Sequence, residues 1–143
     1  MALVPEHIFR EYDIRGIADT ELTDEFVMLI GQAFGTWLLA RGVRKASLGG
    51  DARLSTKRIK AAAAAGMTKA GISVTDIGLA STPTFYWSMY HLNTDGGIMV
   101  TGSHNPKEFN GLKVAYDKAT LWGDDIQEIL RIIKEGRIET AEI

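Results

Sequence analysis

The chain has 143 residues, of which 45% are apolar, 16 are Lys or Arg, 18 are Asp or Glu and none is Cys. The lack of cysteine excludes disulfide scaffolds, thiol catalysis and Cys-ligated zinc. The net charge of −2 is spread along the chain without a basic stripe, which argues against nucleic acid and anionic membrane as partners. No stretch is apolar enough to span a bilayer and no secretory signal is visible, so we expect a cytoplasmic protein.

The first half of the chain predicts a helix, a strand and a second helix. Residues 23–41 repeat apolar side chains every three or four positions, which predicts a helix with one buried face. Residues 48–51 predict a short strand that ends in a Gly-Gly-Asp turn. Residues 55–70 predict an Ala-rich helix, capped by Ser55 or Thr56 and ended by the following glycine.

The second half of the chain continues this alternation. Three further strands are predicted at 72–77, 97–101 and 112–116. Thr82 followed by Pro83 predicts a helix N-cap with proline at the first helical position. Asn110-Gly111 favours a tight hairpin, so the last of these strands is expected to run antiparallel to the one before it. Asp124 is expected to cap a final amphipathic helix.

Strands that alternate with helices predict an α/β fold. We expect a three-layer α/β/α domain over residues 1–143, with a mixed, mostly parallel sheet of about four main strands and flanking helices. Residues 137–143 complete neither a helix nor a strand. This segment is therefore predicted to be the start of a linker.

Three polar loops follow predicted strands, at 49–55, 80–83 and 101–106. Ligands of open α/β sheets bind beyond the carboxyl ends of the strands, where loops and helix N-termini converge. The last loop is the most informative, because a buried strand leads directly into Thr-Gly-Ser-His-Asn-Pro. Ser103 is therefore expected to be presented to solvent and not packed in the core.

The residues of this loop leave three interpretations open. It can be a polar turn in which Ser103 and Asn105 bond their own backbone. It can belong to a serine hydrolase, but His104 would point away from its neighbour on an extended segment and the Gly-x-Ser-x-Gly elbow is absent. It can also carry a phosphoserine, whose two negative charges the cations Arg15 and Lys113 would stabilise.

Four segments of the chain resemble the first domain of the α-D-phosphohexomutases in order and spacing. They are Phe9–Gly16, Gly50–Arg53, Thr101–Pro106 and Asn110–Lys113. The chain is similar to part of a phosphomannomutase/phosphoglucomutase. This resemblance implies a four-domain enzyme in which residues 1–143 are domain I and 137–143 begin the linker to a second domain. Surfaces that the other domains would cover are expected to expose apolar side chains.

The resemblance also implies a reaction. Ser103 would be phosphorylated and pass its phosphoryl group to a hexose 1-phosphate of mannose or glucose. The resulting hexose 1,6-bisphosphate, which also serves as activator, would return its other phosphoryl group to Ser103 and leave the hexose 6-phosphate. Arg15, Lys113 and His104 match positions around the transferring group. One Mg²⁺ would bind a phosphoryl oxygen on Ser103 and three Asp of a second-domain loop that is absent from this chain.

Binding or purely structural roles remain open for several of the candidate site residues. Tyr12 and Asn105 can bind substrate or support the loop. Asp51 and Arg53 can contact phosphate, or they can cap the following helix and brace the loop. Arg15 can also pair with Asp13 or with another surface carboxylate, an ion pair that is worth about 0–1 kcal/mol when exposed. An alternative function is a non-catalytic module of the same fold that binds anions or phosphosugars. In either case the chain alone is expected to be catalytically incomplete.

Overall fold

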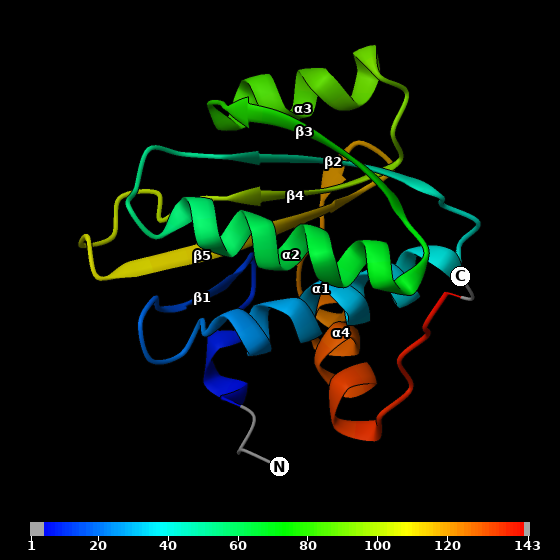
Figure 1. Cartoon of the computed structure of the whole chain (residues 1–143), viewed down its shortest axis with the longest axis horizontal. Helices are drawn as coiled ribbons and strands as arrows, with labels where there is room; N and C mark the ends of the chain where they lie inside the picture. The colour runs from blue at the N-terminus through cyan, green and yellow to red at the C-terminus, as the bar shows by residue number, and fades with distance from the viewer. Residues whose placement is uncertain (1–4, 142–143) are drawn as a thin grey trace.

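The computed structural model describes residues 5–141 (Figure 1). The elements in chain order are the 3-10 turn η1 (Glu6–Ile8), β1 (Ile14–Ile17), α1 (Asp24–Leu39), β2 (Lys45–Gly50), α2 (Thr56–Ala70), β3 (Ser73–Leu79), α3 (Thr82–His91), β4 (Gly96–Val100), β5 (Phe109–Tyr116), β6 (Ala119–Thr120) and α4 (Asp124–Glu135). The strands form one sheet in the order β1-β5-β4-β2-β3, and β6 pairs with β5.

The sheet is mixed, and a single described strand is reversed. β2 pairs parallel with both β3 and β4. β5 pairs antiparallel with β4, β1 and β6. Among the strands of residues 5–141, β5 therefore runs opposite to all the others. The prediction of a mostly parallel sheet with the strand at 112–116 reversed is confirmed.

Helices cover both faces of the sheet, which confirms the three layers. Alternate residues of β4 point to opposite faces. Ile98 and Val100 enter the large core that α1, α2 and α4 share with the sheet. Met99 enters a smaller core with Phe85 and Met89 of α3. In Figure 1, α3 accordingly lies apart from the other three helices.

Helices α1 and α2 approach each other through glycine. A Cβ atom at Gly31 would lie 2.5 Å from the carbonyl oxygen of Ala63. A Cβ atom at Gly66 would collide with the carbonyl oxygen of Met28 and lie 2.8 Å from the amide nitrogen of Gln32. The two helix backbones are therefore in direct contact, and neither glycine can gain a side chain without separating them.

The first strand and the expected hairpin turn differ from the prediction. Residues Ile14–Ile17 form β1, which the sequence did not predict, and they pair with Phe109–Leu112 of β5. Asn110-Gly111 lies inside β5 and not in a turn. The buried Asn110 side chain donates hydrogen bonds to the hydroxyls of Ser55 and Thr56, so it serves the interior of the domain.

Two helix starts are shifted from the predicted positions. The N-cap of α3 is Ser81, whose hydroxyl accepts a hydrogen bond from the backbone N–H of Thr84. Thr82 is already helical. Gly123 precedes α4 and provides no side-chain cap, so Asp124 is the first helical residue. Its carboxylate still lies in the first turn, where it offsets the helix dipole.

The segment after α4 lies against α1 and α2. The Gln32 amide donates to the carbonyl oxygen of Glu139 at 2.8 Å, and the Glu139 N–H donates to the Thr36 hydroxyl at 2.9 Å. The Ala141 N–H donates to the carbonyl oxygen of Lys69 at 2.8 Å. Residues 142 and 143 lie outside the described residues. A linker over 137–143 and a single domain over 1–143 stay predictions.

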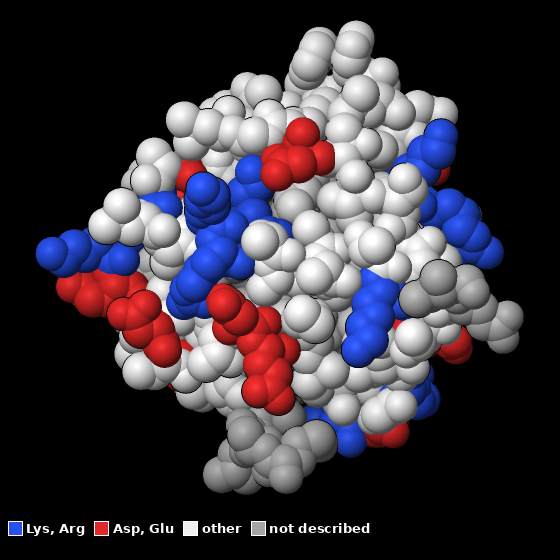
Figure 2. Space-filling view, in the orientation of Figure 1, with Lys and Arg blue, Asp and Glu red and all other residues white. Residues whose placement is uncertain are grey.

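The surface carries mixed charge and several large apolar side chains. Figure 2 shows basic side chains beside acidic ones on the face that α1 and α2 cover. Within residues 5–141, no helix is long and apolar enough to cross a membrane. Leu54, Leu79, Trp87, Tyr90 and Trp122 are exposed. That other domains would cover such surfaces stays a prediction.

Candidate functional site

The three polar loops lie at the carboxyl ends of the parallel strands. The loop after β2 lies between the loop after β4 and the loop after β3. Gly50 at the end of β2 pairs with Leu79 of β3 and with Val100 of β4. The Asp51 N–H donates to the carbonyl oxygen of Val100, and the Ala80 N–H donates to that of Gly50, both at 2.9 Å. The three loops therefore share one edge of the sheet, as the sequence predicts (Figure 1).

Ser103 is exposed on the loop after β4, residues 101–108, which we call the serine loop. Its backbone φ of 52° is in the left-handed region, which a residue with a side chain adopts at a cost of about 1–3 kcal/mol. The Ser103 N–H donates to the Thr101 hydroxyl at 3.0 Å. Within residues 5–141 the Ser103 hydroxyl makes no hydrogen bond, so it is available to a ligand.

Arg53 holds the serine loop through main-chain carbonyl groups. Its Nη1 donates to the carbonyl oxygens of Pro106 and Phe109 at 2.7 and 3.1 Å. Its Nη2 donates to those of Asn105 and Ser103 at 2.6 and 3.2 Å. A planar guanidinium with several fixed donors suits such a set of acceptors. These contacts are those of a brace, one of the two roles that the sequence leaves open for Arg53.

Asp51 joins the serine loop to the start of α2. Its Oδ2 accepts from the Gly102 N–H at 3.0 Å. Its Oδ1 accepts from the Arg53 N–H at 3.1 Å and from the Thr56 hydroxyl at 2.6 Å. Ser55 is the N-cap residue of α2, as one of the two predicted alternatives has it, but its side chain makes no cap hydrogen bond. Asp51 instead bonds the hydroxyl of Thr56, the first helical residue.

The Asp51 carboxylate is stabilised in its ionised form. Partial burial raises its pKa, but the hydrogen bonds from Thr56, Arg53 and Gly102 together outweigh burial. The pKa of Asp51 therefore lies below its ordinary value of 3.8. The folded chain binds a proton here less readily than the unfolded chain does.

Asp51→Asn is expected to weaken the acid sensitivity of the fold. Because the pKa of Asp51 is lowered on folding, its carboxylate stabilises the fold above the unfolded pKa, and this contribution is lost as the pH falls through the folded pKa. The variant is expected to be less stable than the original chain at about pH 6, with a difference that shrinks towards about pH 3. Urea unfolding across this range measures it, and a constant difference would contradict the assignment.

Arg15 connects β1 to the serine loop. Its Nε and Nη2 donate to Oδ2 of Asp13 at 3.0 and 2.7 Å. Its Nη1 lies 3.4 Å from Oδ1 of Asn105, whose own amide donates to the carbonyl oxygen of Gly102. Asp13 is only 3% exposed. The carboxylate partner of Arg15 is therefore buried, and the pair is not the surface ion pair that the sequence leaves open.

Lys113 and Arg15 project from the same face of the sheet. Lys113 pairs with Met99, and Arg15 pairs with Gly111, two residues before Lys113 on β5. Met99 packs against α3, so this is the α3 face. Among residues 5–141 no hydrogen bond joins Lys113 to the serine loop.

Tyr12 and His104 are exposed and less firmly placed. Tyr12 is 64% exposed just before β1, and His104 follows Ser103 on the serine loop. In the described part of the chain neither side chain makes a hydrogen bond. The fold thus brings Arg15, Asp51, Arg53 and Asn105 together around the Ser103 loop, and leaves these two side chains at its surface.

No described histidine is placed to activate Ser103 as in a serine hydrolase. His7 contacts Glu21, and the ring of His91 stacks on that of Trp87. His104 makes no hydrogen bond to its neighbour. Residues 5–141 also contain no group of three or more His, Asp or Glu side chains that could hold a metal ion.

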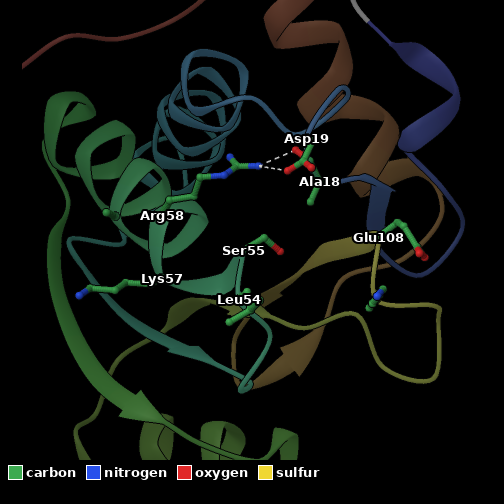
Figure 3. Close-up of a pocket in the computed structure, with 9 residues that line it drawn as sticks. Ala18, Asp19, Leu54, Ser55, Lys57, Arg58 and Glu108 are labelled. Carbon is green, nitrogen blue, oxygen red and sulfur yellow. Dashed lines mark hydrogen bonds and ion pairs between the residues drawn. The ribbon is translucent and has the colours of Figure 1, made fainter.

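A hollow lined by several charged side chains lies beside the serine loop and not at Ser103. It measures about 780 Å³ and is lined by Ala18, Asp19, Leu54, Ser55, Lys57, Arg58, Ala61, Lys107 and Glu108. Figure 3 shows Arg58 reaching across it from α2 towards Asp19. Arg58 donates to the carbonyl oxygens of Ala18 and Leu22 at 2.6 and 2.7 Å, so its guanidinium is already used by the fold. None of the predicted site residues lines this hollow.

In the sequence-based prediction, Asp13 is only a possible surface partner of Arg15, and Thr101 has no role in the site. Side chains two residues apart on a strand share a face. The Asp-x-Arg spacing would have placed Asp13 and Arg15 on one face if β1 had been predicted, but the burial of Asp13 was not predicted. The Thr101 hydroxyl accepts from the N–H of Ser103, two residues later. This is a common local turn pattern of threonine, so the sequence contained a signal for Thr101.

Known proteins share the sequence pattern and the fold of this chain. Residues 6–139 match the family model described as phosphoglucomutase/phosphomannomutase, alpha/beta/alpha domain I. A phosphoglucomutase from Neisseria meningitidis is 40% identical over 141 residues, which are 99% of this chain and 31% of that protein. A phosphomannomutase/phosphoglucomutase from Pseudomonas putida is 39% identical over an alignment of 149 positions, which covers 99% of this chain and 32% of that protein.

A solved structure gives the same result. The crystal structure of a phosphoglucomutase/phosphomannomutase family protein from Burkholderia thailandensis superposes with a TM-score of 0.91 at 34% identity, over 98% of this chain and 32% of that one. The chain thus spans about a third of the length of the curated relatives that it matches. The match to the domain model over nearly the whole chain establishes that the chain belongs to the phosphoglucomutase/phosphomannomutase family.

Proposed function

We propose that this chain is the phosphoserine-bearing domain of a phosphohexomutase that interconverts the 1- and 6-phosphates of mannose or glucose. The observation that carries the proposal is the exposed, unbonded hydroxyl of Ser103 at the ligand-binding edge of the sheet. Its loop is held by Asp51 and Arg53 and is in contact with the cation of Arg15. Family membership supports the same reaction.

The proposed reaction moves one phosphoryl group at a time. The P–O bond to Ser103 Oγ breaks as the O6 hydroxyl of a hexose 1-phosphate forms a new P–O bond, and the hydroxyl proton passes to Ser103 Oγ or to a neighbouring base. The C1 phosphoryl group of the 1,6-bisphosphate then returns to Ser103 and leaves the hexose 6-phosphate. Arg15 and Lys113 would stabilise the charge on the transferring group, and His104 or Lys113 would exchange the proton.

Magnesium enters the proposal only as a cofactor of a longer protein. The described residues do not form a metal site, and the sequence contains no Asp-x-Asp-x-Asp loop. From this chain the ion would be contacted through phosphoryl oxygens on Ser103. We also propose that the chain alone does not isomerise sugar phosphates, since it spans about a third of relatives whose names state the whole activity.

Ser103→Ala is expected to abolish covalent phosphorylation by hexose 1,6-bisphosphate. The full-length protein that contains this domain is incubated with the bisphosphate and its intact mass is measured. The unmodified sequence is expected to gain one phosphoryl group, and the variant none, because the accepting oxygen is gone. Ser81→Ala is the matched control, since Ser81 lies at the same sheet edge and its loss should leave the labelling unchanged.

Two outcomes would contradict the proposal. Equal labelling of the Ser103→Ala variant would show that another residue carries the phosphoryl group. Binding of the bisphosphate without any labelling of the unmodified protein would favour the non-catalytic module that binds phosphosugars. A coupled assay of the 143-residue chain alone, with magnesium and the bisphosphate, tests the proposed incompleteness, which ordinary turnover would overturn.

A further inference from the structure

The carboxylate of Asp13 is buried directly behind the arginine that reaches the serine loop. Asp13 is 3% exposed, and the Arg15 side chain is 26% exposed. Nε and Nη2 of Arg15 donate to one oxygen of Asp13 at 3.0 and 2.7 Å. A buried carboxylate is rare unless it is paired. Arg15 is the cation with which Asp13 pairs.

This pairing fixes the direction of the Arg15 guanidinium. The group is planar and rigid, so two donors held on one edge determine where the remaining nitrogen points. That nitrogen, Nη1, lies 3.4 Å from Oδ1 of Asn105. Asn105 in turn donates from its side chain to the carbonyl oxygen of Gly102, next to Ser103. A chain of contacts therefore runs from Asp13 to the residue that precedes the exposed serine.

We propose that Asp13 is a positioning residue, which holds the Arg15 guanidinium so that it faces a phosphoryl group on Ser103. This role rests on the function proposed above. An arginine on a flexible stem would have to be ordered at each transfer, whereas a guanidinium already held by a buried carboxylate needs no such reorganisation. Asp13 itself is too deeply buried to touch a sugar phosphate.

Asp13→Asn is expected to lower kcat of the full-length protein by about 100-fold, the usual effect of a small misplacement of a catalytic group. KM should change much less, because Arg15 keeps its charge. The guanidinium of Arg15 is partly exposed and can be hydrated, so the variant is expected to fold. The double variant Asp13→Asn/Arg15→Ala should lose no more kcat than Arg15→Ala alone, since both substitutions act through one guanidinium. Asp24→Asn removes an exposed carboxylate paired with Arg58 and is the matched control, with activity unchanged.

A second readout does not depend on activity. In the NMR spectrum of the 143-residue chain, the Nε–H of Arg15 should exchange slowly with water because it is bonded to a buried acceptor. Asp13→Asn should speed this exchange, and Asp24→Asn should not.

Asp13→Glu, which keeps the charge but lengthens the side chain, should give intermediate turnover.

The outcomes separate this role from the proposed function. If the unmodified full-length protein is neither phosphorylated nor active, the proposed function fails, and the positioning role for that reaction fails with it. If the unmodified protein is active and Asp13→Asn is equally active, or its loss adds fully to that of Arg15→Ala, the positioning role alone is overturned. The same holds if turnover of the Asp13 variants follows only their thermal stability, or if Arg15 Nε–H exchange is unchanged in Asp13→Asn.

Discussion

Replacing Gly66 by alanine is expected to lower the free energy of unfolding by about 3 kcal/mol, although alanine is the better helix former. The new methyl group would collide with the carbonyl oxygen of Met28 and lie 2.8 Å from the amide nitrogen of Gln32. Both atoms belong to the α1 backbone, which cannot turn away as a side chain can. The helices must separate, and the core between them loses its close packing.

Thermal unfolding of the Gly66→Ala chain should show a midpoint lower by roughly 10 °C for a loss of that size. Ala65→Gly, at the neighbouring exposed position, calibrates helix propensity and should cost only about 1 kcal/mol. If Gly66→Ala were as stable as the original chain, the direct contact between the α1 and α2 backbones would be refuted.

The contact between α1 and α2 also affects the candidate site. α2 begins at Thr56, whose hydroxyl bonds Asp51, and Asp51 bonds the Gly102 N–H of the serine loop. A displacement of α2 would therefore shift the carboxylate that ties this loop to the sheet edge. The Asp51 side chain therefore couples packing far from Ser103 to the geometry around it.

The sequence predicts those parts of the fold that local pattern specifies. The helical spacing over 23–41 and the apolar run before Thr101 each describe one element, and both appear in the structure. β1 was not predicted, because Ile14–Ile17 contains a charged residue and a glycine. It is a strand because it pairs with β5, nearly 100 residues later in the chain. Asn110-Gly111 was predicted as a turn but lies inside β5, again because pairing with the distant β1 decides the structure.

Some residues of the candidate site can likewise be identified from a local motif, whereas others depend on contacts between distant elements. The Thr-Gly-Ser-His-Asn-Pro motif is sufficient to nominate Ser103, and the motif Phe9–Gly16 is sufficient to nominate Arg15. The burial of Asp13 depends on side chains from distant elements, and no local pattern specifies it. The bonds from Arg53 end on main-chain oxygens, which every residue has, so the sequence gives no sign of which ones it reaches.

Arg53→Ala is expected to release the serine loop and to cost about 3 kcal/mol of unfolding free energy. The variant loses four hydrogen bonds from a charged donor to the carbonyl oxygens of residues 103, 105, 106 and 109. It also leaves the Asp51 carboxylate without the guanidinium 3.4 Å away. Hydrogen exchange followed by mass spectrometry should show faster exchange in peptides that cover 101–109. Arg53→Lys should rescue little, because an ammonium group cannot reproduce the planar fork of donors.

Arg58→Ala is the matched control for the release of the serine loop in Arg53→Ala. Arg58 also donates to main-chain carbonyl oxygens, those of Ala18 and Leu22, and its side chain is also partly buried. Its loss should lower stability while exchange in 101–109 stays as in the original chain. If Arg53→Ala left that exchange unchanged and weakened only the binding of hexose 1,6-bisphosphate, Arg53 would contact phosphate and would not brace the loop. The unliganded chain thus distinguishes the two roles, because a phosphate contact has no effect on the loop before the phosphate binds.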